Sequence, residues 1–138
     1  SQQARKLLAS WLPTGNWQTV VWKRQWFKVY EFLLQISRDG QQRLALQKLS
    51  AGGRAPRHDH LGREITVILQ GGFSDELGVY EEGDFIVREA GHEHRPRAME
   101  NCDCVCLALS EAPVKLTGAL GQALDFTRRV LTPAVHRA

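Results

Sequence analysis

The sequence predicts an all-β fold, a sandwich or a barrel, formed by a single domain of 138 residues. Short runs rich in Val, Ile, Phe, Trp and Tyr, which fit a pleated sheet, recur about every ten residues. Glycine-rich turn signals separate these runs, as is typical of all-β sandwiches and barrels. The chain has the common domain size of roughly 100–150 residues, so it can bury a core without disulfide bonds.

The expected strands follow one another along the chain. The first strand-forming region covers residues 17–36, where Val, Trp, Phe and Tyr are concentrated. Arg38-Asp39-Gly40 is a turn signal, and residues 43–49 then alternate apolar and polar side chains with the period of a strand. Later strands are expected at four places, with Gly-containing turns between them: residues 65–69, 79–80, 85–87 and 102–109.

Both ends of the chain carry helical patterns. Residues 2–12 place four apolar side chains at helical spacing before Pro13, which predicts a short helix on the flank of the domain or the tail of a linker. We therefore divide the chain into an N-terminal helix or linker, residues 1–16, and a main domain, residues 17–138. Near the other end, three leucines at helical spacing predict a helical turn: Leu116, Leu120 and Leu124. Residues 127–131 are expected to form a final strand.

Composition narrows the class of protein. The apolar fraction of 43% and the charged fraction of 24% are those of an ordinary globular domain. The net charge of +3 is small and spread along the chain, so we expect no direct binding to nucleic acid. No run of about 18 apolar residues is present, and the N-terminus lacks the apolar region of a signal peptide. We expect a soluble, cytoplasmic protein without a membrane span.

The densest chemical feature is a pair of histidines near a glutamate. His58 and His60 lie two residues apart, so both imidazoles project to one face of an extended strand. Glu64 has the same parity, and Gly62 allows the chain to bend and bring the carboxylate round. Two imidazoles and a carboxylate at one point are a common ligand set for a divalent metal. A second cluster around His94 can supply a third imidazole from a neighbouring strand.

The spacing of these residues resembles the two motifs of the cupin superfamily. Residues 52–71 read G-x5-H-x-H-x3-E-x6-G, and residues 83–94 read G-x5-E-x-G-x2-H. One departure is Glu89, where the second motif usually has proline. The resemblance implies a jelly-roll-like β-barrel and places the metal ligands at four positions: His58, His60, Glu64 and His94. One divalent metal ion is implied, zinc first, with iron, manganese and nickel as alternatives.

A longer stretch resembles the C-terminal cupin-like domain of ChrR-type anti-sigma factors. The similarity runs from about Trp17 to about Phe126 and includes H-x-H-x-G-x-E, G-x-F-S-D-E-x-G-x-Y-x-x-G-D and H-R-P. In that family a separate N-terminal zinc-binding domain binds a sigma factor. The cupin-like domain is needed for release of the sigma factor under singlet-oxygen or organic-peroxide stress. No His/Cys motif of the sigma-binding kind precedes Trp17. The chain is therefore expected to be either a fragment of a longer regulator, whose further domain holds the sigma factor, or a free-standing relative.

The three cysteines are crowded into five positions, which is not the pattern of a disulfide framework. Cys102, Cys104 and Cys106 share parity, so all three thiols are expected on one side of their strand. If that side is the interior, they are oxidisable sensors near the metal; if it is not, they are small apolar side chains in a core. His92 shares the parity of His94 and is either a second partner of the metal site or a turn histidine.

These features support two functions of different classes. A regulatory, stress-sensing domain with a closed zinc site is the first. A small metalloenzyme, a dioxygenase or an isomerase, is the alternative, because a centre with three histidines and one glutamate also holds metals with open positions. The sequence assigns no catalytic residue beyond the ligands. Binding of a small ligand in the mouth of the barrel is a third possibility.

Two further expectations concern packing and assembly. We expect five side chains in the core: Phe73, Phe85, Val87, Leu107 and Leu109. Four tryptophans within residues 11–26 are more than one small core usually accommodates, so we expect a homodimer formed through the Trp-rich segment 17–30.

Overall fold

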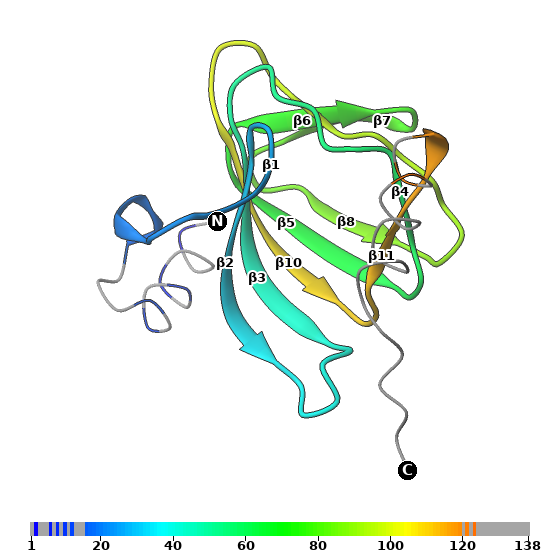
Figure 1. Ribbon diagram of the computed structural model, residues 1–138. Helices are drawn as coiled ribbons and strands as arrows, with labels where there is room; N and C mark the ends of the chain where they lie inside the picture. The colour runs from blue at the N-terminus through cyan, green and yellow to red at the C-terminus, as the bar shows by residue number, and fades with distance from the viewer. Residues whose placement is uncertain are drawn as a thin grey trace.

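The computed structural model describes residues 16–119 together with residues 2, 6, 8, 10, 12, 121 and 123. Within residues 16–116 the only helical element is a single 3-10 turn, and all other regular structure is β (Figure 1). The elements in chain order are η1 (Trp17–Thr19), β1 (Lys23–Trp26), β2 (Val29–Ile36), β3 (Arg43–Leu49), β4 (His58–His60), β5 (Glu64–Gln70), β6 (Gly72–Asp75), β7 (Gly78–Glu81), β8 (Phe85–Arg88), β9 (Arg97–Ala98), β10 (Cys104–Ser110) and β11 (Val114–Leu116).

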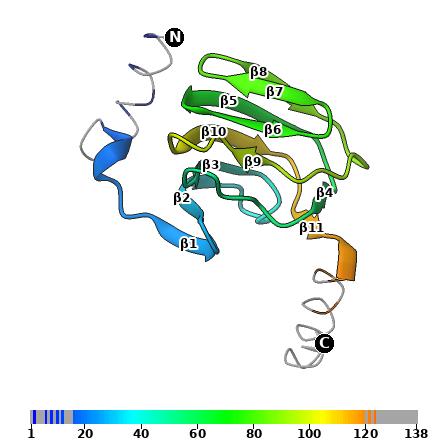
Figure 2. The same cartoon turned by 90° about the horizontal axis from the view of Figure 1, so that it is seen from above.

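The strands form three antiparallel sheets. The large sheet has six strands in the order β1-β2-β3-β10-β5-β8, and the small sheets have the orders β7-β6-β9 and β11-β4. Figure 1 shows β6 and β7 in a layer above β5, β8 and β10 of the large sheet, and in Figure 2, seen from above, the two layers overlap. The all-β prediction is confirmed. The ladders of the described residues do not join into one cylinder, so the predicted barrel is open rather than closed.

Two apolar clusters lie on opposite faces of the large sheet. The inner cluster fills the space between the large sheet and the β7-β6-β9 sheet, and its buried members are Leu49, Ala55, Ile68, Phe73, Ile86, Ala98, Cys104 and Cys106. The outer cluster joins Leu46, Leu69 and Val105 of the sheet to residues that precede it, among them Leu8, Leu12, Trp17 and Trp22. The N-terminal segment therefore covers part of the outer face.

The predicted core is correct in part. Phe73 is buried in the inner cluster, and Leu107 packs against the outer one. Phe85, Val87 and Leu109 were expected inside but are 65%, 44% and 39% exposed. Alternation along the strands explains the error, because the side chains of β8 and β10 that point inward are those of the opposite parity.

The first strand region is divided by a tight turn that the sequence does not signal. β1 and β2 form a hairpin in which Trp26 pairs with Val29, and Lys28 adopts a left-handed conformation with φ of 60°. No glycine stands at this turn. Contacts with the β3–β4 connection hold the strained residue: its Nζ donates to the carbonyl of Ala51 and its carbonyl accepts from the N–H of Ser50.

The chain crosses from the large sheet to the small one at Gly71-Gly72. Gly71 has a φ of 69°, in the left-handed region that favours glycine. A Cβ atom on Gly71 would overlap the carbonyl oxygen of Asp103, and one on Gly72 would overlap that of Tyr80. Both glycines therefore allow three backbone segments to approach closely where β5 ends and β6 begins.

Predictions for the two ends fall partly outside the described residues. The expected helix covers a range of which residues 2, 6, 8, 10 and 12 are described, and the expected division at residue 16 stays a prediction. Leu116 belongs to β11 and pairs with His58, so the helical interpretation was wrong for that residue. Leu120, Leu124 and residues 127–131 lie outside the described set. None of the described helical residues forms a helix of the length and apolarity that a membrane crossing requires.

Candidate metal centre

Three histidines from two separate segments meet at one end of the space between the sheets. His58 and His60 are the first and last residues of β4, and His94 lies on the connection between β8 and β9. The backbones of His58 and His94 pair as an antiparallel bridge, in which each N–H donates to the carbonyl of the other at 3.1 and 2.9 Å. The bridge places side chains 36 residues apart in the sequence side by side.

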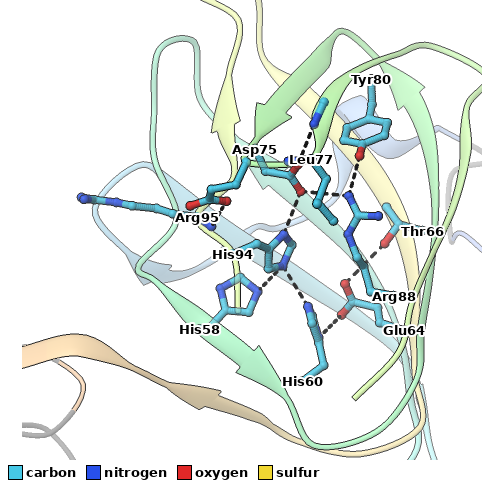
Figure 3. Close-up of polar contacts among 12 residues, drawn as sticks. His58, His60, Glu64, Thr66, Asp75, Leu77, Tyr80, Arg88, His94 and Arg95 are labelled. Carbon is cyan, nitrogen blue, oxygen red and sulfur yellow. Dashed lines mark hydrogen bonds and ion pairs between the residues drawn. The ribbon is translucent and has the colours of Figure 1, made fainter. Parts of the chain in front are cut away.

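The Nε2 atoms of the three rings converge (Figure 3). The Nε2 atom of His94 lies 2.8 Å from Nε2 of His60 and 2.9 Å from Nε2 of His58. His60 and His94 are only 2% and 5% exposed, and His58 is half-buried. One donor atom from each residue can be chosen so that all three lie within 4.8 Å of one another. Donor atoms this close fit around a single ion.

In the rings of His58 and His94, the other nitrogen, Nδ1, already has a hydrogen-bond partner. Nδ1 of His58 lies 2.8 Å from the carbonyl oxygen of Pro56, and Nδ1 of His94 lies 3.0 Å from Oδ2 of Asp75. Both partners accept hydrogen bonds, so in the neutral rings Nδ1 carries the proton and Nε2 carries a lone pair. Two lone pairs that face each other across 2.9 Å repel unless a cation lies with them. The donor set therefore fits a divalent metal ion.

Burial keeps these rings in the form that binds metals. Burial lowers the pKa of His60 to about 4, and the neighbouring His58 contributes to the shift. The pKa values of His58 and His94 are also lowered, in both cases mainly by burial. All three imidazoles are consequently neutral near pH 7, the state in which a histidine can ligate a metal.

Glu64, the fourth expected ligand, is buried beside His60. Its Oε2 atom lies 3.7 Å from Nδ1 of His60, and its carboxylate accepts hydrogen bonds from Oγ of Ser110 at 3.0 Å and from Oγ1 of Thr66 at 3.4 Å. The close group of donor atoms comprises the three histidines without Glu64. The carboxylate thus borders the group, and its role as a ligand stays a prediction.

Sequence reasoning missed Asp75, whose carboxylate accepts a hydrogen bond from Nδ1 of His94. Its side chain is completely buried, and its Oδ2 atom also accepts a hydrogen bond from the guanidinium of Arg88 at 3.0 Å. Burial would raise the pKa of Asp75, but the hydrogen bonds from His94, the backbone of Leu77 and Arg88 outweigh it and hold the pKa below its ordinary value. In the sequence, Asp75 lies in a turn signal before Gly78 and within the stretch that resembles the ChrR-type domain, but neither signal connects it with His94.

His92 lies apart from the histidine group. Its side chain is exposed, and its Nδ1 atom contacts the carbonyl oxygen of Glu89 at 3.3 Å. Of the two interpretations that the sequence left open, the geometry favours the turn histidine.

The three cysteines occupy two different environments. Cys104 and Cys106 point into the inner cluster with their Sγ atoms 3.5 Å apart, whereas Cys102 is half-buried in the turn before β10. The expectation that all three thiols share one side of a strand is therefore correct only for the two residues within β10. The hydrogen bond with Cys104, together with burial, raises the pKa of Cys106, so its thiol is protonated.

Comparison with solved structures identifies the fold as a cupin. An RmlC-like cupin protein from Ralstonia eutropha superposes with a TM-score of 0.66, covering 83% of this chain and 85% of that chain, at 17% sequence identity. At this identity the likeness shows the fold alone.

The sequence comparisons define the family within that fold. The sequence model of the ChrR cupin-like domain matches residues 11–113, most of the chain, and the protein belongs to this family. The anti-sigma-E factor ChrR of Cereibacter sphaeroides is 41% identical over 70 residues, which cover 50% of this chain and 33% of ChrR. A crystal structure of Rhodobacter sphaeroides SigE in complex with the anti-sigma ChrR superposes with a TM-score of 0.63 and 32% identity, covering 69% of this chain and 50% of that chain. The chain thus spans about a third to a half of these relatives.

Proposed function

We propose that this domain binds one zinc ion and serves as the stress-sensing part of a regulator that controls a sigma factor. The observation that carries the proposal is the convergence of the three Nε2 atoms of His58, His60 and His94, two of them in rings whose other nitrogen is already hydrogen-bonded. Zinc accepts imidazole and carboxylate ligands in a closed tetrahedral site of structural character. Glu64 supplies the fourth ligand in this proposal.

The regulatory half of the proposal is supported by the family. ChrR is described as an anti-sigma-E factor and was crystallised with SigE. Because this chain spans about a third to a half of those relatives, we assign sigma-factor binding to a further domain and sensing to this one. In this arrangement the state of the metal centre decides how the cupin-like domain fits against its partner.

Metal content and coordination test the first half. The purified protein is analysed for metals, and X-ray absorption at the metal edge gives the number and kind of ligands. We expect one zinc with three imidazoles and one carboxylate. Iron, manganese or nickel in a six-coordinate site with exchangeable water would contradict the closed zinc site and direct the search to a dioxygenase or isomerase reaction.

Exposure to oxidants tests the second half. The zinc-loaded protein is treated with singlet oxygen from an illuminated photosensitiser, or with an organic hydroperoxide, while a chromogenic chelator reports released zinc. We expect zinc release or a change in near-UV circular dichroism at doses that leave a dark or untreated sample unchanged. A protein that keeps its zinc and its spectrum under both oxidants is not a sensor of either.

A further inference from the structure

We propose that Asp75 is a positioning residue for the metal centre: it orients His94 and ties the centre to the turn between β6 and β7. The inference rests on the proposed metal site and extends it to a residue outside the ligand set. Four contacts define the role. The Oδ2 atom of Asp75 accepts from Nδ1 of His94 and from Arg88, and its Oδ1 atom accepts from the backbone N–H groups of Leu77 and Gly78 at 2.9 and 3.2 Å.

The carboxylate of Asp75 fixes the orientation of the His94 ring, on which the convergence of the three Nε2 atoms depends. The Nε2 atom of His94 is the one that lies within 3 Å of both other Nε2 atoms, so its direction decides whether the three donors converge. A ring that donates through Nδ1 to a fixed carboxylate can neither flip nor carry its proton on Nε2. The carbonyl of Pro56 does the same for His58.

Asp75 is itself held from both sheets. Arg88 lies at the end of β8 in the large sheet, and besides Asp75 it donates to the hydroxyl of Tyr80 on β7 at 2.7 Å. Its guanidinium carbon lies 5.2 Å from the centre of the Tyr80 ring. Figure 3 shows the resulting chain of contacts from Tyr80 through Arg88 and Asp75 to His94. A shift of the β6–β7 hairpin therefore moves the partner of a metal-binding ring.

The substitution Asp75→Asn tests this role. The amide keeps the size of the side chain, but it removes the charge and leaves one accepting oxygen in place of two. Its NH2 group must then face either His94 and Arg88 or the N–H groups of Leu77 and Gly78, none of which can accept from it. Zinc affinity is measured by competition with a chromophoric chelator. We expect a loss of roughly 10- to 100-fold, the usual effect of removing such a partner. An affinity within about twofold of the wild type would overturn the proposal.

Asp84→Asn is the matched control. Asp84 is exposed, and its carboxylate accepts a hydrogen bond from the N–H of Glu81 in a neighbouring turn at 2.8 Å without contacting a histidine. The control should bind zinc like the wild type. An equal loss in both variants would assign the effect to general electrostatics and also overturn the proposal.

A second measurement does not depend on how the variant folds. The ¹⁵N chemical shifts of the histidine rings in wild-type protein, zinc-loaded and metal-free, report which nitrogen carries the proton. We expect His94 to be protonated at Nδ1 in both states; a proton on Nε2, or zinc bound through Nδ1, would refute the role of Asp75. If wild-type protein binds no zinc, the proposed function fails, whereas the metal-free spectrum still decides the orientation of His94.

Discussion

The two ends of the strand pair β5–β10 share one geometry but differ in chemistry. At one end Glu64 pairs with Ser110, and the carboxylate, the hydroxyl and the nearby His60 form a polar group. At the other end Cys106 pairs with Ile68 inside an apolar cluster. Cys106 and Ser110 are four residues apart, which is roughly 13 Å along a strand. Inward parity alone therefore does not place a thiol beside the histidine group, because the position along the strand also matters.

The largest expected effect is a loss of zinc binding on substitution of His60, at the polar end of the strand pair, where Glu64 and Ser110 lie. His60→Ala removes one of the three converging nitrogens, so we expect the variant to be purified without stoichiometric zinc. The loss of affinity should exceed the roughly 10- to 100-fold cost typical of losing an outer hydrogen-bond partner. Elemental analysis after dialysis against zinc provides the measurement. His92→Ala is the control, because that exposed ring lies outside the group; full zinc content in His60→Ala would refute the ligand assignment.

If the histidine group holds zinc as proposed, removal of the zinc should destabilise the domain as a whole. A ligand at 100 times its dissociation constant stabilises the folded state by about 2.7 kcal/mol, which corresponds to a rise in Tm of roughly 10 °C for a domain of this size. Thermal unfolding followed by circular dichroism, with excess zinc or with a chelator, measures the difference. Identical midpoints under both conditions would mean that the folded state has no preference for zinc.

The thiol end should respond to substitution in stability and not in metal content. Cys104→Ser places a hydroxyl among apolar side chains, where an unsatisfied polar group costs about 1–3 kcal/mol. Urea unfolding gives the change in the free energy of unfolding, and elemental analysis gives the zinc content, which we expect to stay at the wild-type level. Loss of zinc from Cys104→Ser would instead make a thiolate a ligand and erase the distinction between the two ends.

The smallest expected effect is that of a substitution at Thr66, midway between the polar end and the thiol end of the strand pair β5–β10. Thr66 lies on β5 between Glu64 and Ile68, and its hydroxyl donates to the Glu64 carboxylate at 3.4 Å, a long hydrogen bond. Thr66→Val keeps the shape of the side chain and should cost at most about 0.5–1.5 kcal/mol, because Ser110 still donates to the carboxylate. Chemical unfolding and zinc competition measure both consequences. A loss of zinc as large as that of His60→Ala would place Thr66 in the centre itself.

The sequence predicted the fold class from the spacing of its strands, and the three histidines from local spacing together with the resemblance to the two cupin motifs. Strand alternation put His58 and His60 on one face, and the second motif placed His94 within reach. The partner of His94 escaped prediction, since the contact with Asp75 depends on how β6 lies against the connection between β8 and β9. One oxygen of Asp75 does serve the turn that the sequence indicated, and only the fold shows what the other oxygen contacts.

The error in the core has a different cause. Alternation divides the residues of a strand between two faces but does not say which face is inside. Cys104 and Cys106 have the opposite parity to Leu107 and Leu109, so the two pairs cannot both point inward. We predicted that the leucines point inward because they are more apolar. In the structure the cysteines point inward, and Leu109 is partly exposed. The pairing with β5 shows which face of β10 points inward. Ser110 pairs with Glu64, whose carboxylate lies beside His60, so residues of β10 with the parity of Ser110 point inward.

The close backbone approach at Gly71-Gly72 also limits how far the sequence can diverge. An alanine at Gly71 would press on the carbonyl of Asp103, directly before β10, and one at Gly72 would press on the backbone carbonyl of Tyr80 on β7. In a saturation library selected for folding, these two positions should accept almost nothing but glycine. The pair thus acts as an evolutionary constraint on the crossing from β5 to β6, although neither glycine has a side chain to contribute.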